Sequence, residues 1–177
     1  MGKTVNTTGA VSRVDLMGGR LWTAKAPQRP PWALPEPAFL DICTGCDACI
    51  DACPTSILKQ ARGGYPVVDF ACGECTFCGD CVSACRPRAL RNAGSTPPWT
   101  LLATVASGCL SATGTMCRMC GDRCEAGAIT FKLALGGRAS PIIDPAHCTG
   151  CGACVAPCPV NAIDIMSETM ISETRGR

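Results

Sequence analysis

Apolar residues in this chain come in short runs, separated by turn-forming residues and by dense clusters of cysteine. The longest run, Trp99–Ala106, is far shorter than the roughly 18 residues that a membrane-spanning helix needs. Short apolar runs bounded by glycine, proline or asparagine are typical of strands. The strands predicted in this way cover residues 39–42, 57–59, 65–69, 99–105, 128–132, 141–144 and 162–165.

The same order of features occurs twice along the chain: a cysteine motif, a hairpin around Gly-Gly, a second cysteine motif and a closing strand. The hairpins centre on Gly63-Gly64 and Gly136-Gly137. This repeat predicts an α+β protein of two tandem units, joined by a linker rich in Gly, Ser and Pro. The predicted divisions are a Pro-rich N-terminal extension 1–38, a first unit 39–92, a second unit 99–166 and a polar tail 167–177.

Four motifs account for all of the 17 cysteines except Cys72. The spacing C-x2-C-x2-C-x3-C is the one with which bacterial ferredoxins hold [4Fe–4S] clusters, since a short loop can offer three thiolates to three irons of one cube. In the third motif the first gap has grown from two residues to seven. The motifs are Cys43/Cys46/Cys49/Cys53, Cys75/Cys78/Cys81/Cys85, Cys109/Cys117/Cys120/Cys124 and Cys148/Cys151/Cys154/Cys158.

Two other uses of so many cysteines fit the pattern less well. A disulfide framework is disfavoured because the count is odd and the triplets crowd their thiols. Zinc prefers two C-x2-C pairs in a tetrahedron rather than triplets with a fourth, more distant cysteine. The chain has only one Tyr, three Trp and four Phe for an apolar core, so bound clusters are expected to help hold it together.

Charge and the N-terminal sequence bear on partners and location. The formal charge of +2 counts cysteines as neutral, and four clusters of about −2 each would make the loaded protein acidic, so nucleic-acid binding has no support. Arg13 and Asp15 interrupt the only candidate for a signal-peptide core. We therefore expect a cytoplasmic protein without a membrane span.

Each half of the chain resembles the bacterial two-[4Fe–4S] ferredoxin, a small pseudo-symmetric α+β unit. In that fold the fourth cysteine of one motif ligates the cluster of the other motif. The resemblance implies four sites, each binding one [4Fe–4S] cluster. They are site I (Cys43, Cys46, Cys49, Cys85), site II (Cys75, Cys78, Cys81, Cys53), site III (Cys109, Cys117, Cys120, Cys158) and site IV (Cys148, Cys151, Cys154, Cys124).

Over residues 12–165 the chain resembles the NapF-type ferredoxins, accessory proteins of the periplasmic nitrate reductase system. The matching features are Arg29–Trp32, Cys46–Ile50, Gly63–Pro66, Cys151–Cys154 and, most specific, the stretched third motif. The family implies a non-catalytic cytoplasmic protein that acts, prior to export, on the catalytic subunit of that reductase, in electron supply or maturation. Its electron donor stays open. Where the family often has paired arginines near the N-terminus, this chain has only Arg13.

Two other functions stay open: an electron-wire component of another respiratory or hydrogenase-type complex, and a binding chaperone whose clusters are structural. The sequence offers no acid–base pair, nucleophile or phosphate loop, so an enzyme is not expected.

Several single residues also carry expectations. His147 and Cys72 are expected not to be ligands, and Met116, Met119 and Phe77 are expected to shield clusters. The extension is expected to be either a loose tail or a docking segment through Lys25, Arg29, Trp32 and Leu34.

Overall fold

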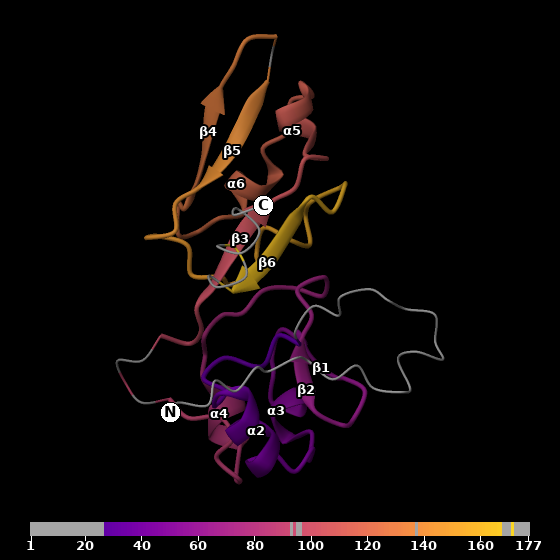
Figure 1. The fold of residues 1–177 in the computed structure, drawn as a ribbon, viewed down its shortest axis with the longest axis vertical. Helices are drawn as coiled ribbons and strands as arrows, with labels where there is room; N and C mark the ends of the chain where they lie inside the picture. The colour runs from indigo at the N-terminus through magenta and orange to yellow at the C-terminus, as the bar shows by residue number, and fades with distance from the viewer. Residues whose placement is uncertain (1–26, 93, 95–96, 137, 168–170, 172–177) are drawn as a thin grey trace, which may run out of the picture.

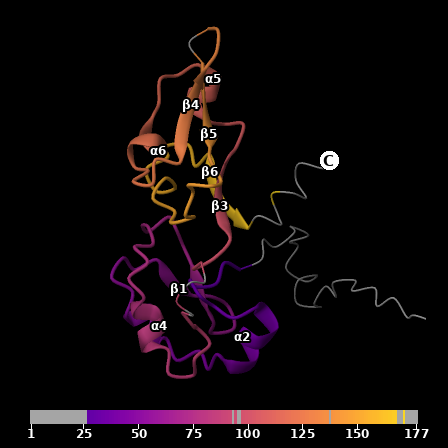
Figure 2. The same cartoon turned by 90° about the vertical axis from the view of Figure 1, so that its left-hand side faces the viewer.

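The computed structural model describes residues 27–92, 94, 97–136, 138–167 and 171. They form two units stacked along the long axis of the molecule, the first below and the second above (Figure 1). A view turned by 90° shows the same stacking (Figure 2). Each unit combines one-turn to two-turn helices with antiparallel two-stranded sheets, which confirms the predicted α+β class and tandem repeat.

The first unit contains the predicted hairpin. β1 (Leu58–Gln60) pairs antiparallel with β2 (Pro66–Val68), and Leu58 lies opposite Val68. Three short helices surround this hairpin: α2 (Glu36–Ile42), α3 (Ala48–Asp51) and α4 (Asp80–Ala84).

Residues 39–42 form part of helix α2, so the strand predicted there is wrong. Glu36 and Pro37 occupy the first turn, where an acidic side chain and a proline both favour a helix start. The helix buries Phe39 completely. Ala33 instead makes an isolated antiparallel bridge with Leu90, and this bridge closes the unit.

The described part of the predicted extension, residues 27–34, packs on the first unit. The backbone N–H of Val68 donates to the carbonyl of Gln28 (2.8 Å), and that of Leu34 donates to the carbonyl of Ala89 (3.0 Å). Trp32 exchanges backbone hydrogen bonds with the far end of the unit, at Arg91 and Pro98. The loose-tail interpretation is therefore wrong for residues 27–34. Residues 1–26, with Arg13 and Lys25, lie outside the described part of the chain.

Arg29 fastens this segment to the unit. Its Nε and Nη2 donate to the carboxylate of Glu36 at 3.0 and 2.6 Å, and its Nη1 donates to the carbonyl of Pro66 at 3.1 Å. The guanidinium lies 4.9 Å from the centre of the Phe39 ring and 5.6 Å from that of Tyr65. The hydrogen bond from Arg29 lowers the pKa of Glu36 from its usual 4.5, against a smaller opposing effect of burial.

We expect Arg29→Ala to destabilise the first unit by about 2 kcal/mol, because it removes a bidentate pair and a half-buried cation–π contact together. Arg29→Lys should recover only part of this, since an ammonium cannot make the two-pronged contact. The measurement is anaerobic thermal unfolding of the loaded protein, with Arg62→Ala, at an exposed turn, as the control. Equal melting temperatures for the Arg29 and Arg62 variants would contradict this role.

The second unit contains two sheets. β3 (Leu101–Val105) pairs antiparallel with β6 (Ile163–Ser167), and β4 (Ile129–Leu133) pairs antiparallel with β5 (Ala139–Ile143). Its helices are α5 (Leu110–Thr113) and α6 (Met119–Asp122). The predicted second hairpin and closing strand are confirmed. Most of the predicted polar tail (168–170 and 172–177) lies outside the described residues.

The apolar core is small and includes cysteines. Among the described residues, only Phe39, Ile57 and Pro66 are large side chains less than 2 % exposed. Cys81, Cys120 and Cys154 belong to the same core cluster as Leu58, Leu101 and Ile163. Among the residues described, none of the helices has the length and apolar character that crossing a bilayer requires.

Candidate iron–sulfur sites

Site I lies at the base of the first unit. Cys43 caps the C-terminal end of α2, while Cys46 and Cys49 come from the loop before α3 and from α3 itself. Cys85, from the second motif, lines the same cavity of about 340 Å³. The backbone N–H of Ala48 and the side chain of Thr44 lower the pKa of Cys46, so this site supplies hydrogen-bond donors to a thiolate.

Site II mirrors site I. Cys75, Cys78 and Cys81 line a cavity of about 330 Å³ together with Cys53, which comes from the first motif. Burial opposes ionisation of Cys53, but hydrogen bonds from the Thr55 side chain and from nearby backbone N–H groups outweigh it, so the pKa of Cys53 is lowered. The structure thus places the fourth cysteine of each motif beside the three cysteines of the other.

Site III has the same plan with a longer loop. Cys109, Cys117, Cys120 and Cys158 line a cavity of about 330 Å³. The extra residues between Cys109 and Cys117 form helix α5, and its buried Ser111 donates a hydrogen bond from Oγ to the carbonyl of Ala139 on β5. The insertion is therefore packed against the hairpin instead of looping free.

Site IV brings together the triplet of the last motif. Burial raises the pKa of Cys154 to about 12, and the neighbouring Cys151, Cys148 and Cys120 raise it further. Cys124, the fourth member expected from the ligand exchange, follows α6 directly, just as Cys53 follows α3.

The donor set fits an iron–sulfur cluster. Four soft thiols around one cavity are the usual ligands of [4Fe–4S], each binding a different iron. Among the described residues, no three His, Cys, Asp or Glu side chains converge closely enough to hold one metal ion. Burial raises the pKa of Cys49 and Cys75 to about 11 and that of Cys81 to about 12, so these thiols are protonated at neutral pH until a metal displaces the proton.

The residues expected not to be ligands lie outside the cavities described. Cys72 is exposed, and its thiol donates to the Asp69 carboxylate at 3.7 Å. His147 is exposed, with Nδ1 2.7 Å from a carboxylate oxygen of Asp144, and this contact lowers the pKa of Asp144.

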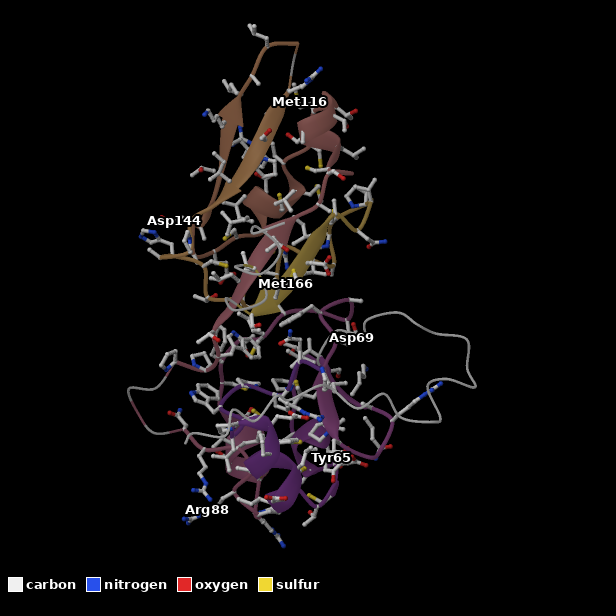
Figure 3. All side chains as sticks on the ribbon, viewed as in Figure 1. Tyr65, Asp69, Arg88, Met116, Asp144 and Met166 are labelled. Atoms are coloured by element: carbon white, nitrogen blue, oxygen red, sulfur yellow. The ribbon has the colours of Figure 1, made fainter. Side chains whose placement is uncertain are left out.

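The predicted shielding residues divide. Phe77 lines site II and Met119 lines site III. Met116 is 94 % exposed and projects from the upper end of the second unit, so its predicted shielding role is wrong (Figure 3). The inserted loop carries its side chain outward, away from the cavity. Thr55 and Ser111 contribute hydrogen bonds that no sequence signal indicates.

We expect Cys72→Ser to retain the full iron and sulfide content and the absorption spectrum of the parent protein, because this thiol faces solvent. Iron and sulfide assays on anaerobically purified protein provide the measurement. Cys75→Ser, three residues further on, is the matched variant that should lose a cluster. A loss of about four irons in Cys72→Ser would make this residue a ligand.

Comparisons with known proteins agree with this geometry. Residues 42–90 and 115–162 each match the family described as "4Fe-4S dicluster domain". The second match begins after Cys109 and most of the inserted loop, the part in which the third motif departs from the usual spacing. The two units are therefore tandem dicluster ferredoxin-like domains.

Longer relatives cover both domains. The chain is 45% identical to "Ferredoxin-type protein NapF" of Escherichia coli K12 over 152 residues, 86% of this chain and 92% of that protein. It is 45% identical to the Haemophilus influenzae protein of the same name over 135 residues, 76% of each chain. It is also 31% identical over 191 residues to "Methylamine utilization ferredoxin-type protein MauM" of Methylophilus methylotrophus, covering 96% of this chain and 82% of that protein. The chain belongs to the NapF family of ferredoxin-type iron–sulfur proteins, which transfer electrons.

Proposed function

We propose that the chain binds four [4Fe–4S] clusters, one at each of sites I to IV, with the ligand sets given above. The observation that carries this proposal is that three cavities each collect four cysteines, and that every one of these sets takes its fourth cysteine from the partner motif. Cys124 completes site IV by the same exchange. The clusters supply reversible one-electron chemistry when bound.

The chain's own residues bind the clusters, exclude water and set the potential. Phe77 and Ile57 line site II, while Leu110, Phe131 and Ile163 line site III, so one side of each cavity is apolar. Donors to sulfur, such as the Thr55 hydroxyl 3.6 Å from Cys53 Sγ, favour the more negative reduced state. The backbone N–H of Ala162 lies 3.2 Å from Cys158 Sγ and acts in the same way at site III.

The proposed role is that of a cytoplasmic accessory protein, which supplies electrons to the catalytic subunit of periplasmic nitrate reductase, or assists its maturation, prior to export. The support is the identity to NapF proteins across both domains, together with the preference of thiolate-bound clusters for reducing surroundings. An electron-wire component of another complex is the second candidate. It is favoured by 37% identity over 132 residues to one of the subunits of the ion-translocating oxidoreductase complex of Methanosarcina acetivorans, of which the match covers 46%.

The test is capture of a tagged chain from separated cytoplasmic and periplasmic fractions. We expect the precursor of the nitrate reductase catalytic subunit to be captured from the cytoplasmic fraction, and deletion of the gene to lower mature nitrate reductase activity. Electron flow to enzyme that is already assembled should persist. Capture only in the periplasm, or capture of a membrane dehydrogenase instead, would overturn the assignment in favour of the electron-wire component.

Reversible redox titration of the purified chain separates the carrier from the chaperone with structural clusters. A carrier takes up electrons at potentials within reach of a cellular donor. Clusters that accept none before the protein unfolds would support the chaperone.

A further inference from the structure

The two domains meet at two of the four sites. The backbone N–H of Cys75, a site II cysteine, donates to the carbonyl of Cys151, a site IV cysteine, at 2.8 Å. Both residues belong to cysteine-bearing loops, so this hydrogen bond joins the wall of one site to the wall of the other. The contact lies at the boundary between the lower and upper units in Figure 1, close to where Asp69 is labelled in Figure 3.

Further contacts surround this hydrogen bond and involve neighbours of the same two sites. Arg123, which precedes Cys124, lies 3.8 Å from the carboxylate of Glu74, which precedes Cys75. The indole N–H of Trp99 donates to the carbonyl of Thr149 in the last motif at 2.9 Å. On its other side the Trp99 ring meets Phe77 of site II edge-on, with the ring centres 5.6 Å apart.

The fit at this boundary requires a glycine. Gly152, directly after Cys151, has φ +84° and lies against the ring of Phe70 from the first domain. A Cβ atom added there would overlap that ring. Phe70 is 8 % exposed and packs edge-on against Trp99 with ring centres 5.8 Å apart, so the ring has little room to move away.

Within each domain the two sites are also neighbours. Cys53 leaves the motif of site I at the end of α3 and lines site II, while Cys85 leaves the motif of site II at the end of α4 and lines site I. The same crossing links site III and site IV through Cys158. Across the domain boundary, the contacts named above involve site II and site IV alone.

We infer that the four sites form one line in the order I–II–IV–III, and that electrons cross between the domains at the Cys75–Cys151 contact. This order differs from the order of the motifs along the chain, which would place site III next to site II. The inference rests on the proposed binding of four clusters. One electron leaves a reduced cluster at site II and arrives at an oxidised cluster at site IV, so one is oxidised as the other is reduced and no bond is broken.

The test compares two glycine variants. Gly79 occupies the position in the second motif that Gly152 occupies in the fourth, directly after the second cysteine, and its φ of +82° is almost the same. A Cβ atom on Gly79 would meet nothing within 4 Å. Gly79→Ala therefore carries the same backbone cost as Gly152→Ala, without the overlap with Phe70. Phe70→Ala is a third variant, which loosens the boundary without touching a residue next to a cluster cysteine.

Two readouts on the anaerobically loaded full chain test the junction. Hydrogen–deuterium exchange follows the Cys75 amide, which should be protected in the parent and in Gly79→Ala, and should exchange faster in Gly152→Ala and Phe70→Ala. EPR of the dithionite-reduced protein follows the magnetic interaction between clusters. We expect the part that crosses the domain boundary to be lost in the same two variants, while the interaction within each domain remains.

The outcomes separate this inference from the proposed function. Variants that keep all their iron and an unchanged EPR spectrum, although the Cys75 amide has become exchangeable, would overturn the I–II–IV–III order and leave four clusters in place. Equal behaviour of Gly152→Ala and Gly79→Ala in both readouts would also overturn it. An iron content of about eight in the parent protein would instead contradict the four-cluster proposal itself.

Discussion

Removal of the iron is expected to unfold both domains. The described residues contain few large buried side chains, and Cys81, Cys120 and Cys154 lie within the core, so the empty loops have little to hold them in place. Burial also raises the pKa of Cys81 and Cys154 to about 12, so the apoprotein would hold buried thiols where the loaded protein holds metal-bound thiolates. The free energy of cluster binding is therefore largely free energy of folding.

The measurement is hydrogen–deuterium exchange and far-UV circular dichroism before and after anaerobic treatment with an iron chelator and an oxidant. We expect loss of protection across both hairpins, β1–β2 and β4–β5, with recovery after reconstitution. The same treatment of a cluster-free protein of similar size controls for the reagents. A chelated chain that keeps its protected hairpins would show that the apolar core is sufficient, contrary to this account.

The second large effect is a crossed loss of clusters. Cys53→Ser is expected to damage the cluster at site II, because Cys53 lines the cavity of Cys75, Cys78 and Cys81 and not that of its own motif. Cys85→Ser should damage site I for the reciprocal reason. Each variant should lose up to one cluster, about four irons, or show an altered spectrum where serine replaces the thiolate.

Mössbauer or EPR spectroscopy distinguishes the damaged sites. The reference variants are Cys78→Ser for site II and Cys46→Ser for site I, because each of these residues belongs to the triplet of its own site. The spectrum of Cys53→Ser should match that of Cys78→Ser. If Cys53→Ser matches Cys46→Ser instead, each motif holds its own cluster and the exchange of cysteines between motifs is wrong.

The sequence was sufficient for the cysteine sets, the hairpins and the tandem repeat, because these depend on spacing that a short loop must satisfy. Both hairpins form around the Gly-Gly pairs, and the closing strand β6 lies where its apolar run predicts. The strand predicted at residues 39–42 failed because a four-residue apolar run does not distinguish strand from helix. Pro37 in the first turn and the burial of Phe39 decided for the helix.

Features that depend on contacts between distant segments could not be predicted. Nothing in the sequence places Phe70 on Gly152, or the Cys75 amide on the Cys151 carbonyl, because these residues lie in different domains. The exposure of Met116 depends similarly on how α5 packs against β5. Arg29–Trp32 was recognised as a family feature, but its role as part of the first domain appeared only from its hydrogen bonds.

The number of clusters is the central claim, and direct analysis of iron and acid-labile sulfide tests it. The chain is purified anaerobically, reconstituted, and assayed against a protein concentration from amino-acid analysis. The account predicts about sixteen irons and about sixteen sulfides per chain, four for each of sites I to IV. Saturation at about eight of each, in protein whose two domains are both folded, would contradict it.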